Sequence, residues 1–187
     1  MRKFWPFSFY FLYYSALAMF MPFVVLFYQE LQFNGPQIAL LTGIPPLIAL
    51  FAAPFWTSIA DSTGRHRLVM SLGIGVAIVS ILLFQAMELF AVIFLIVLIF
   101  NFFYSPVPSL SDSATMTMLG EDRAMYGRVR LGGTIGWGLF ALIAGILVDQ
   151  YGLKIVFWGF SLIMLIDLFV AQKLVFDDSK LDGSIST

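Results

Sequence analysis

The chain has 187 residues, of which 60% are hydrophobic and 11% are charged, and its mean hydropathy is +0.94. That much apolar surface excludes an ordinary soluble domain, and a net charge of −1 excludes a basic nucleic-acid-binding surface. Apolar runs recur at about 20 residues, the length that crosses the hydrocarbon core of a bilayer. Cysteine is absent, so no disulfide framework is expected. We therefore predict an all-α protein with several membrane spans.

Six spans are predicted, joined by short turns rich in Gly, Pro, Asn and Asp. Their ranges are Phe4–Tyr28, Ile38–Ala60, Leu68–Met87, Phe90–Leu119, Tyr126–Val148 and Leu153–Phe176. Residues 1–176 would form one six-helix bundle. Residues 177–187 are polar and without apolar periodicity, which predicts a disordered tail or the start of a linker.

The basic residues predict the orientation of the bundle. With the N-terminus inside, nine Lys and Arg residues fall on the cytoplasmic side and only Lys154 on the other. Loops on the cytoplasmic side of membrane proteins carry an excess of Lys and Arg. Both termini are therefore expected in the cytoplasm. The nine are Arg2, Lys3, Arg65, Arg67, Arg123, Arg128, Arg130, Lys173 and Lys180.

The first span is densely aromatic, and we interpret most of its rings as lipid contacts, with Trp5 and Tyr28 as anchors at the interfaces. Phe20 and Pro22, in mid-span, could instead shape a cavity. Kinked or broken helices are expected at the prolines of two further spans, because broken backbone in a membrane has to face protein or a wet cavity. These prolines are Pro45, Pro46, Pro54, Pro106 and Pro108.

Two turns share the pattern Asp-x-x-Gly, at Asp61 to Gly64 and at Asp149 to Gly152. They lie 88 residues apart, at matching positions and on opposite sides of the predicted bilayer. This placement predicts two inverted repeats of three helices each. Asp61 would accept backbone N–H groups at the start of the next helix. The alternative is a simple charged turn at the interface.

The first of these turns resembles the cytoplasmic signature of the major facilitator superfamily, Gly-x-x-x-Asp-Arg/Lys-x-Gly-Arg/Lys-Arg/Lys. Asp61, Gly64 and Arg65 match this signature. The residues that depart from it are Thr57, Ser62 and His66, with Arg67 one place later. The resemblance implies a gating loop formed by Asp61, Gly64, Arg65 and Arg67, with His66 as an ordinary loop residue.

The fourth span carries a polar stripe at helical spacing, formed by Asn101, Ser105, Pro108 and Asp112. A carboxylate inside a span is costly and faces a cavity or a partner charge. Asp112 and Arg130 are nearly equidistant from the turn at Gly120, about 12–15 Å from it along the two helices. They are therefore expected to pair directly or through a bound ligand.

The fifth span places Trp137 two turns beyond Arg130 on the same face. In the alternative interpretation, Arg128 and Arg130 extend to the lipid headgroups and Trp137 only packs. Small residues predict close helix approach on both sides of this span. One small-residue face is formed by Gly132 and Gly136, the other by Gly138 and Gly145.

The stretch from Tyr126 to Trp137, with its Gly-Arg-x-Arg and Gly-Trp, is similar to the fifth helix of the lactose permease and 3-phenylpropionate permease branches of the superfamily. The resemblance implies that Arg130 pairs with the substrate, that Trp137 stacks on its ring, and that Asp112 stands in place of a glutamate. Asn101 and Phe20 are further candidate binding residues.

The same resemblance implies the N-terminal six-helix half of a proton-coupled symporter for a sugar, nucleoside or aromatic acid, in a bacterial inner membrane. Its partners would be the solute, H⁺, the lipid bilayer and a second six-helix half, on the same or a separate chain. No metal or cofactor is expected. Asp112 and Asp167 are the candidates for proton coupling, and Asp167 could instead pair with Lys173 or extend to the interface.

Two alternative functions remain open, and a third is disfavoured. The chain could be a membrane scaffold without transport, or a half-sized transporter that acts as a dimer. An intramembrane enzyme is disfavoured, because the sequence has no cysteine, one histidine and no His-Glu-x-x-His or Gly-x-Ser-x-Gly motif.

Overall fold

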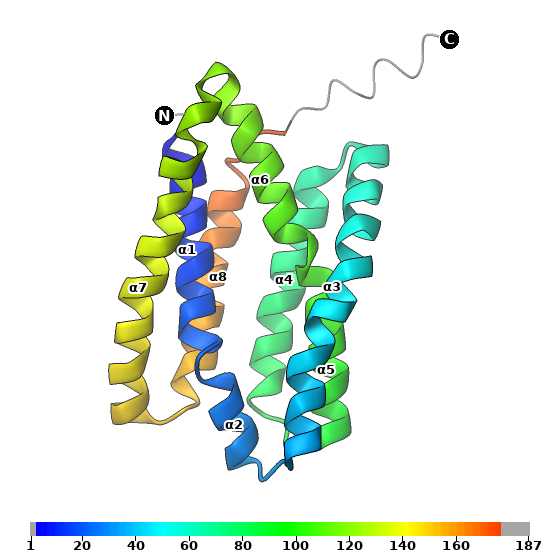
Figure 1. Ribbon diagram of the computed structural model, residues 1–187, viewed down its shortest axis with the longest axis vertical. Helices are drawn as coiled ribbons and strands as arrows, with labels where there is room; N and C mark the ends of the chain where they lie inside the picture. The colour runs from blue at the N-terminus through cyan, green and yellow to red at the C-terminus, as the bar shows by residue number, and fades with distance from the viewer. Residues whose placement is uncertain (1–2, 177–187) are drawn as a thin grey trace.

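The computed structural model describes residues 3–176, and these form helices joined by short turns and loops, with no strand (Figure 1). The predicted polar tail, 177–187, lies outside the described residues. The elements are α1 (Phe4–Phe20), α2 (Val24–Glu30), α3 (Gly35–Thr63), α4 (His66–Phe84), α5 (Phe90–Tyr104), α6 (Pro106–Leu119), the 3₁₀ turn η1 (Gly120–Met125), α7 (Tyr126–Tyr151) and α8 (Ile155–Ala171).

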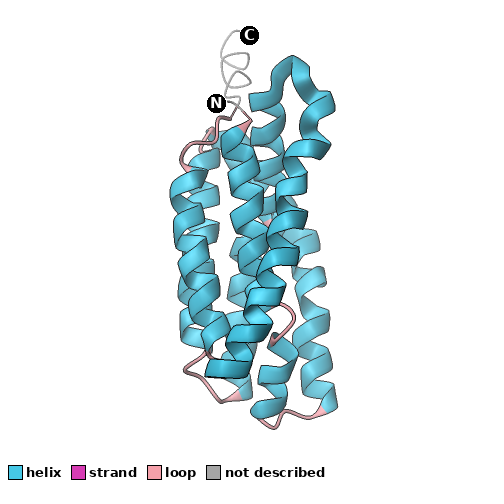
Figure 2. Cartoon of the chain, turned by 90° about the vertical axis from the view of Figure 1, so that its left-hand side faces the viewer, coloured by secondary structure: helices cyan, strands magenta, loops and turns pink. Residues whose placement is uncertain are grey.

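The helices run along one long axis, and the chain reverses at each end of the bundle, as the quarter-turned view in Figure 2 also shows. The start of α1, η1 and the end of α8 lie at the same end (Figure 1). α1 packs against α7 and α8, and α5 packs against α3 and α4. α4 and α8 pack together and join these two groups.

Four helical segments are long and apolar enough to cross a membrane. They are Phe4–Glu30, Gly35–Thr63, His66–Phe84 and Phe90–Tyr151, and Ile155–Ala171 is a shorter apolar helix. The fourth segment has 62 residues because helix continues almost without interruption through η1. The chain turns back on itself there (Figure 1), so this segment contains two antiparallel arms.

Two of the predicted spans are broken, and a break was expected only in the fourth. The first divides into α1 and α2 at the turn Met21–Phe23, which contains Pro22, and the fourth divides at Ser105. Pro106 opens α6, where a missing backbone N–H costs no hydrogen bond. By contrast, α3 stays one helix of 29 residues although it holds three prolines.

The interpretation of the first span as mainly lipid-facing is wrong for α1. Phe9, Tyr10 and Tyr13 are between 1% and 4% exposed, and Tyr28, expected at the interface, is 3% exposed. The reason is that α1 lies between α7 and α8 and covers both. A helix that is apolar on all sides suits a buried position as well as a lipid-facing one.

Glycines end two of the long helices. Gly64 follows α3 with φ 65°, and Gly152 follows α7 with φ 79°, backbone angles that an L side chain rarely adopts. The two turns lie at opposite ends of the bundle (Figure 1). At the start of α3, Asn34 and Gln37 form a reciprocal capping box.

Candidate functional site

Asp112 and Arg130 come together on one side of the bundle. Asp112 lies in the middle of α6 and Arg130 in the second turn of α7, and Arg130 Nη1 is 3.9 Å from Asp112 Oδ2. Both side chains are part-exposed, at 38% for Asp112 and 46% for Arg130. The separation is too long for a hydrogen bond, so this is an open ion pair that leaves donors and an acceptor free for a third group.

Tyrosine hydroxyls hold both members of this pair. Tyr10 donates to Asp112 Oδ1 at 2.6 Å, a short charge-assisted hydrogen bond from α1. Arg130 donates to the hydroxyl oxygen of Tyr126 at 2.9 Å and to that of Tyr14 at 3.4 Å. None of the three tyrosines is among the site residues predicted from the sequence. Two of them, Tyr10 and Tyr14, have the four-residue spacing of one helix face, which was the available signal.

Small residues bring α7 close enough to α1 for these contacts. A Cβ at Gly132 would lie 2.7 Å from the carbonyl oxygen of Phe7, and one at Gly136 would lie 2.6 Å from the hydroxyl of Ser15. The predicted close approach on this face is therefore confirmed. The second predicted face is wrong for the described chain, since nothing lies within 4 Å of a Cβ at Gly138 or Gly145.

A cavity of about 430 Å³ opens beside the ion pair. Its lining residues come from α1 and α7, and they are Tyr14, Arg130, Gly133, Thr134, Trp137 and Gly138. Trp137, at 38% exposure, presents an apolar ring two turns from the guanidinium. The cavity therefore offers a cation at one end and a flat aromatic surface at the other, with the carboxylate of Asp112 adjacent.

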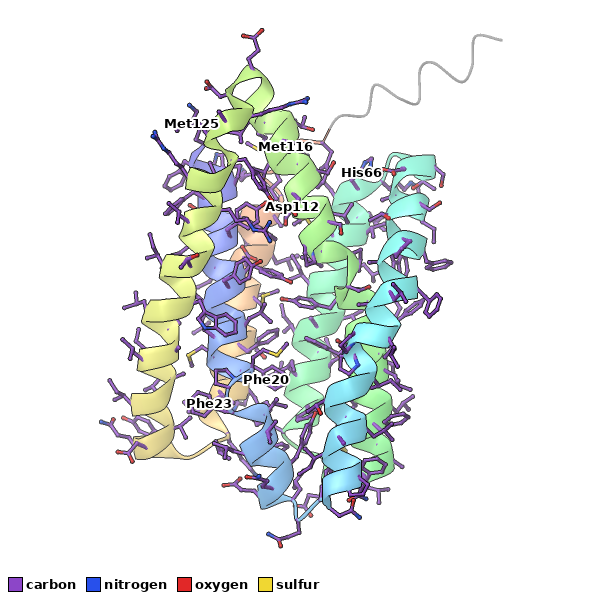
Figure 3. All side chains as sticks on the ribbon, in the orientation of Figure 1. Phe20, Phe23, His66, Asp112, Met116 and Met125 are labelled. Carbon is purple, nitrogen blue, oxygen red and sulfur yellow. The ribbon has the colours of Figure 1, made fainter. Side chains whose placement is uncertain are left out.

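Phe20 and Asn101 line a different cavity, of about 370 Å³, which shares no residue with the first. Figure 3 shows Phe20 well below Asp112 along the bundle. The lining of this second cavity is mostly apolar and includes Tyr28, Pro45, Pro46 and Phe100. Asn101 donates its amide to the Val97 carbonyl of its own helix, so the polar stripe predicted along the fourth span does not form one site.

Comparison with known proteins agrees with this architecture. The model of the MFS_1 like family matches residues 5–185. The protein belongs to the MFS_1 like family of the major facilitator superfamily. It is an integral membrane protein whose relatives are transporters rather than enzymes.

The curated relatives of this MFS_1-like chain include the maltose permease of Geobacillus stearothermophilus, at 25% identity over 89% of the chain and 42% of that protein. They also include the multidrug resistance protein MdtG of Yersinia enterocolitica, at 31% identity over 77% of the chain and 36% of that protein. The chain thus spans less than half the length of these relatives.

Among solved structures, a mutant of the nucleoside transporter NupG superposes with a TM-score of 0.83 and 17% identity, over 94% of the chain and 45% of that structure. The unmutated nucleoside transporter NupG gives a TM-score of 0.80 at 16% identity. At this identity the likeness establishes the shared fold.

In the MFS_1-like chain, the loop between α3 and α4 is tied to the segment that follows α8. His66 Nε2 lies 2.9 Å from Asp61 Oδ1, and Arg67 Nε donates to the Leu174 carbonyl at 3.2 Å. The predicted capping of α4 by Asp61 is wrong, since α4 has no side-chain cap. His66 is buried rather than an ordinary loop residue, and its ring stacks on Phe176 at 5.3 Å. Gly64 and Arg65 line a cavity of about 450 Å³ beside this contact.

Asp167 is completely buried in α8 of the MFS_1-like chain. Neither carboxyl oxygen has a hydrogen-bond partner among the described residues. The expected pairing with Lys173 and the expected extension to the interface are both wrong, because α8 turns this side chain into the bundle while Lys173 is exposed.

Proposed function

We propose that this chain forms the solute-binding half of a secondary active transporter that carries a small polar solute together with a proton. One observation carries the proposal: Asp112 and Arg130, 3.9 Å apart, stand beside a cavity that Arg130 and Trp137 line together. Ionisable residues inside membrane spans are costly and mark solute or ion pathways.

The chemistry of this site suits a solute with both hydroxyl or carboxylate groups and a flat face. The Arg130 guanidinium has donors in a planar fork that matches carboxylates and vicinal hydroxyls. Asp112 keeps an acceptor oxygen beside it, since only Oδ1 is engaged by Tyr10. The indole of Trp137 provides a surface on which a sugar or aromatic ring can stack. Sugars, nucleosides and aromatic acids all meet these requirements.

The proposal includes six spans arranged as two inverted repeats of three, with Asp61, Gly64, Arg65 and Arg67 as a gating loop. Its supports are the two glycine-ended turns at opposite ends of the bundle and the contact of Arg67 with the segment after α8. In such transporters the solute site lies between two repeats that rock against each other. We therefore propose a second six-helix half as partner, facing the side of the bundle that carries Asp112 and Trp137.

The relatives point to more than one class of solute. The solutes of a maltose permease and of a nucleoside transporter are polar, which suits the cavity beside Arg130. A multidrug resistance protein is also among the relatives, and the apolar cavity around Phe20 and Asn101 favours a second candidate function, transport of a hydrophobic compound. The two candidates use different cavities, so they can be separated by mutation.

The test measures binding by the purified 187-residue chain in lipid nanodiscs, through tryptophan fluorescence and thermal stability. The probes are maltose, uridine, 3-phenylpropionate and tetraphenylphosphonium. We expect one of the first three to bind, and Arg130→Ala to weaken its binding about 10- to 100-fold, the effect of losing a hydrogen bond to a charged group.

Arg128→Ala is the matched control, since Arg128 carries the same charge on the same helix and does not line this cavity. Equal binding of a polar probe by wild type, Arg130→Ala and Asp112→Ala, or no binding of any probe, contradicts the proposed site. Binding of tetraphenylphosphonium alone, weakened by Phe20→Ala and unchanged in Arg130→Ala, establishes the second candidate instead.

A further inference from the structure

Asp167 carries a carboxyl group that is buried inside the bundle and is not part of the proposed solute site. Its side chain has 0% exposure, and both of its oxygens lack a hydrogen-bond partner within residues 3–176. It belongs to the buried stripe of α8, together with Phe160 and Met164. This helix packs mainly against α1 and α4, and to a smaller extent against α7.

The ionisable groups near Asp167 are tyrosines. Its carboxyl lies within electrostatic range of the hydroxyls of Tyr13 in α1 and Tyr104 in α5, but beyond hydrogen-bond distance of both. The rings of these two tyrosines stack at 5.5 Å, and the Tyr104 hydroxyl is itself buried without a partner. α4 carries its ionisable side chains, His66 and Arg67, only in its first turn. Among the described residues, no Lys, Arg or His forms an ion pair with Asp167.

An unpaired carboxylate in this position is strongly unfavourable. Burial of an isolated charge away from water costs several kcal/mol or more, whereas a neutral carboxylic acid has no net charge and donates one hydrogen bond. The hydroxyls of Tyr13 and Tyr104 lie beyond hydrogen-bond distance and do not stabilise a charge on Asp167. The surroundings of Asp167 therefore favour the acid form over the carboxylate.

α1 connects this acid to the solute cavity. Tyr13, within electrostatic range of Asp167, is followed directly by Tyr14, whose hydroxyl accepts from Arg130 and which lines the cavity. The rings of Tyr13 and Tyr14 meet edge to face at 5.2 Å. A change of charge at Asp167 thus acts on Tyr13, and through α1 on the residues that hold Arg130.

We propose that Asp167 is a proton-binding site, separate from the solute cavity and coupled to it through Tyr13 and Tyr14. A proton from water adds to one carboxylate oxygen and forms an O–H bond; on release the proton returns to water, and no other bond changes. The coupling rests on the proposed transport function, whereas the proton site itself does not.

The first experiment records infrared spectra of the full chain in phosphatidylethanolamine and phosphatidylglycerol vesicles. We expect a carbonyl-stretch band of a protonated carboxylic acid at neutral pH, shifted in D₂O and lost as the pH rises into the alkaline range. The band should vanish in Asp167→Asn and persist in Asp112→Asn, the matched control in the exposed site. Tyr104→Phe should move the band without removing it.

Three outcomes overturn the proton site: no acid band in wild type, a band that survives in Asp167→Asn, or a band that neither shifts in D₂O nor titrates. The D₂O measurement needs no variant, so it stands even if Asp167→Asn fails to fold. A buried acid with only a packing role would give the last of these outcomes.

The second experiment titrates the affinity for whichever polar probe binds against pH. Coupling predicts an affinity that changes about 5- to 150-fold with pH in wild type and stays flat in Asp167→Asn. An identical pH dependence in both overturns the coupling. If no probe binds, the proposed solute site fails, while the infrared result still decides whether Asp167 holds an exchangeable proton.

Discussion

Arg130 is held by groups from three helices, and the carboxylate is the most distant of them. Tyr126 and Tyr14 accept its hydrogen bonds, its guanidinium lies 5.9 Å from the centre of the Tyr126 ring, and Asp112 is 3.9 Å away. In a direct bidentate pair, the guanidinium donors and the carboxylate acceptors would bind each other and would not be free for a solute. Here the tyrosines orient the guanidinium, and the proposed solute would enter between the two charges without first breaking a tight salt bridge.

Tyr10 is the residue whose loss tests this orientation. Tyr10→Phe removes only the hydroxyl that donates to Asp112. Asp112 then loses its position beside Arg130, and we expect probe binding to weaken about tenfold, which corresponds to about 1.4 kcal/mol, typical of one hydrogen bond to a charged group. Fluorescence titration of the chain in nanodiscs measures the effect.

Tyr151→Phe is the control for Tyr10→Phe, because Tyr151 is 68% exposed at the far end of α7. Unchanged affinity in Tyr10→Phe would mean that Asp112 is held in place without Tyr10, and the orienting role would be wrong.

The charged members of the site could be predicted from sequence, but their hydroxyl partners could not. Counting residues from the turn at Gly120 fixes the depth of Asp112 and Arg130 on two adjacent helices, and depth alone brings them level. The partners Tyr10 and Tyr14 come from a helix more than 100 residues away. Their contact depends on the rotation of α1, which a span that is apolar on all sides leaves undetermined.

At the scale of elements, α7 has two small-residue faces with different environments. Gly132 and Gly136 contact α1, whereas Gly138 and Gly145 have open space around them. The sequence spacing predicts that both faces allow close approach, and it cannot say which face has a neighbour in this chain. The break at Ser105, next to Pro106, was predicted, because proline removes a backbone donor whatever the surroundings. The break at Pro22 was not predicted, and α3 stays one helix in spite of its three prolines.

This difference predicts a loss of stability for one of two matched substitutions and little change for the other. Gly136→Val would force its side chain into the Phe11 carbonyl and the Ser15 hydroxyl, and we expect it to destabilise the chain by about 1–3 kcal/mol, as overpacking does. Gly145→Val adds the same atoms where nothing lies within 4 Å, and we expect it to leave stability unchanged within about 0.5 kcal/mol. Thermal unfolding in nanodiscs compares the two variants.

If both variants were equally destabilised, contact with α1 would not explain the cost, and helix propensity would not either, because Val favours a helix more than Gly does. A loss confined to Gly145→Val would place a neighbour, such as a second copy, on the face that the described chain leaves open.

For the whole molecule, the chain builds one bundle that spans less than half of its relatives, and its charges are distributed unequally between the two ends. Among the described residues, Lys3, Arg65, Arg67, Arg123 and Lys173 lie at or next to the end that holds η1 (Figure 1). Lys154 lies at the opposite end, between α7 and α8. The positive-inside rule therefore predicts that the end with η1 faces the cytoplasm.

The absence of native cysteine makes this orientation directly testable. Ser62→Cys places a thiol in the exposed last turn of α3, at the end with η1, and Ala86→Cys places one in the exposed turn between α4 and α5, at the other end. In intact cells, a membrane-impermeant maleimide should label Ala86→Cys and leave Ser62→Cys unmodified. After permeabilisation both should react, which shows that each thiol is accessible. The reverse pattern in intact cells would mean that the end with η1 faces outward. The basic residues around η1 would then reflect the proposed gating loop and the α6–α7 turn rather than the positive-inside rule.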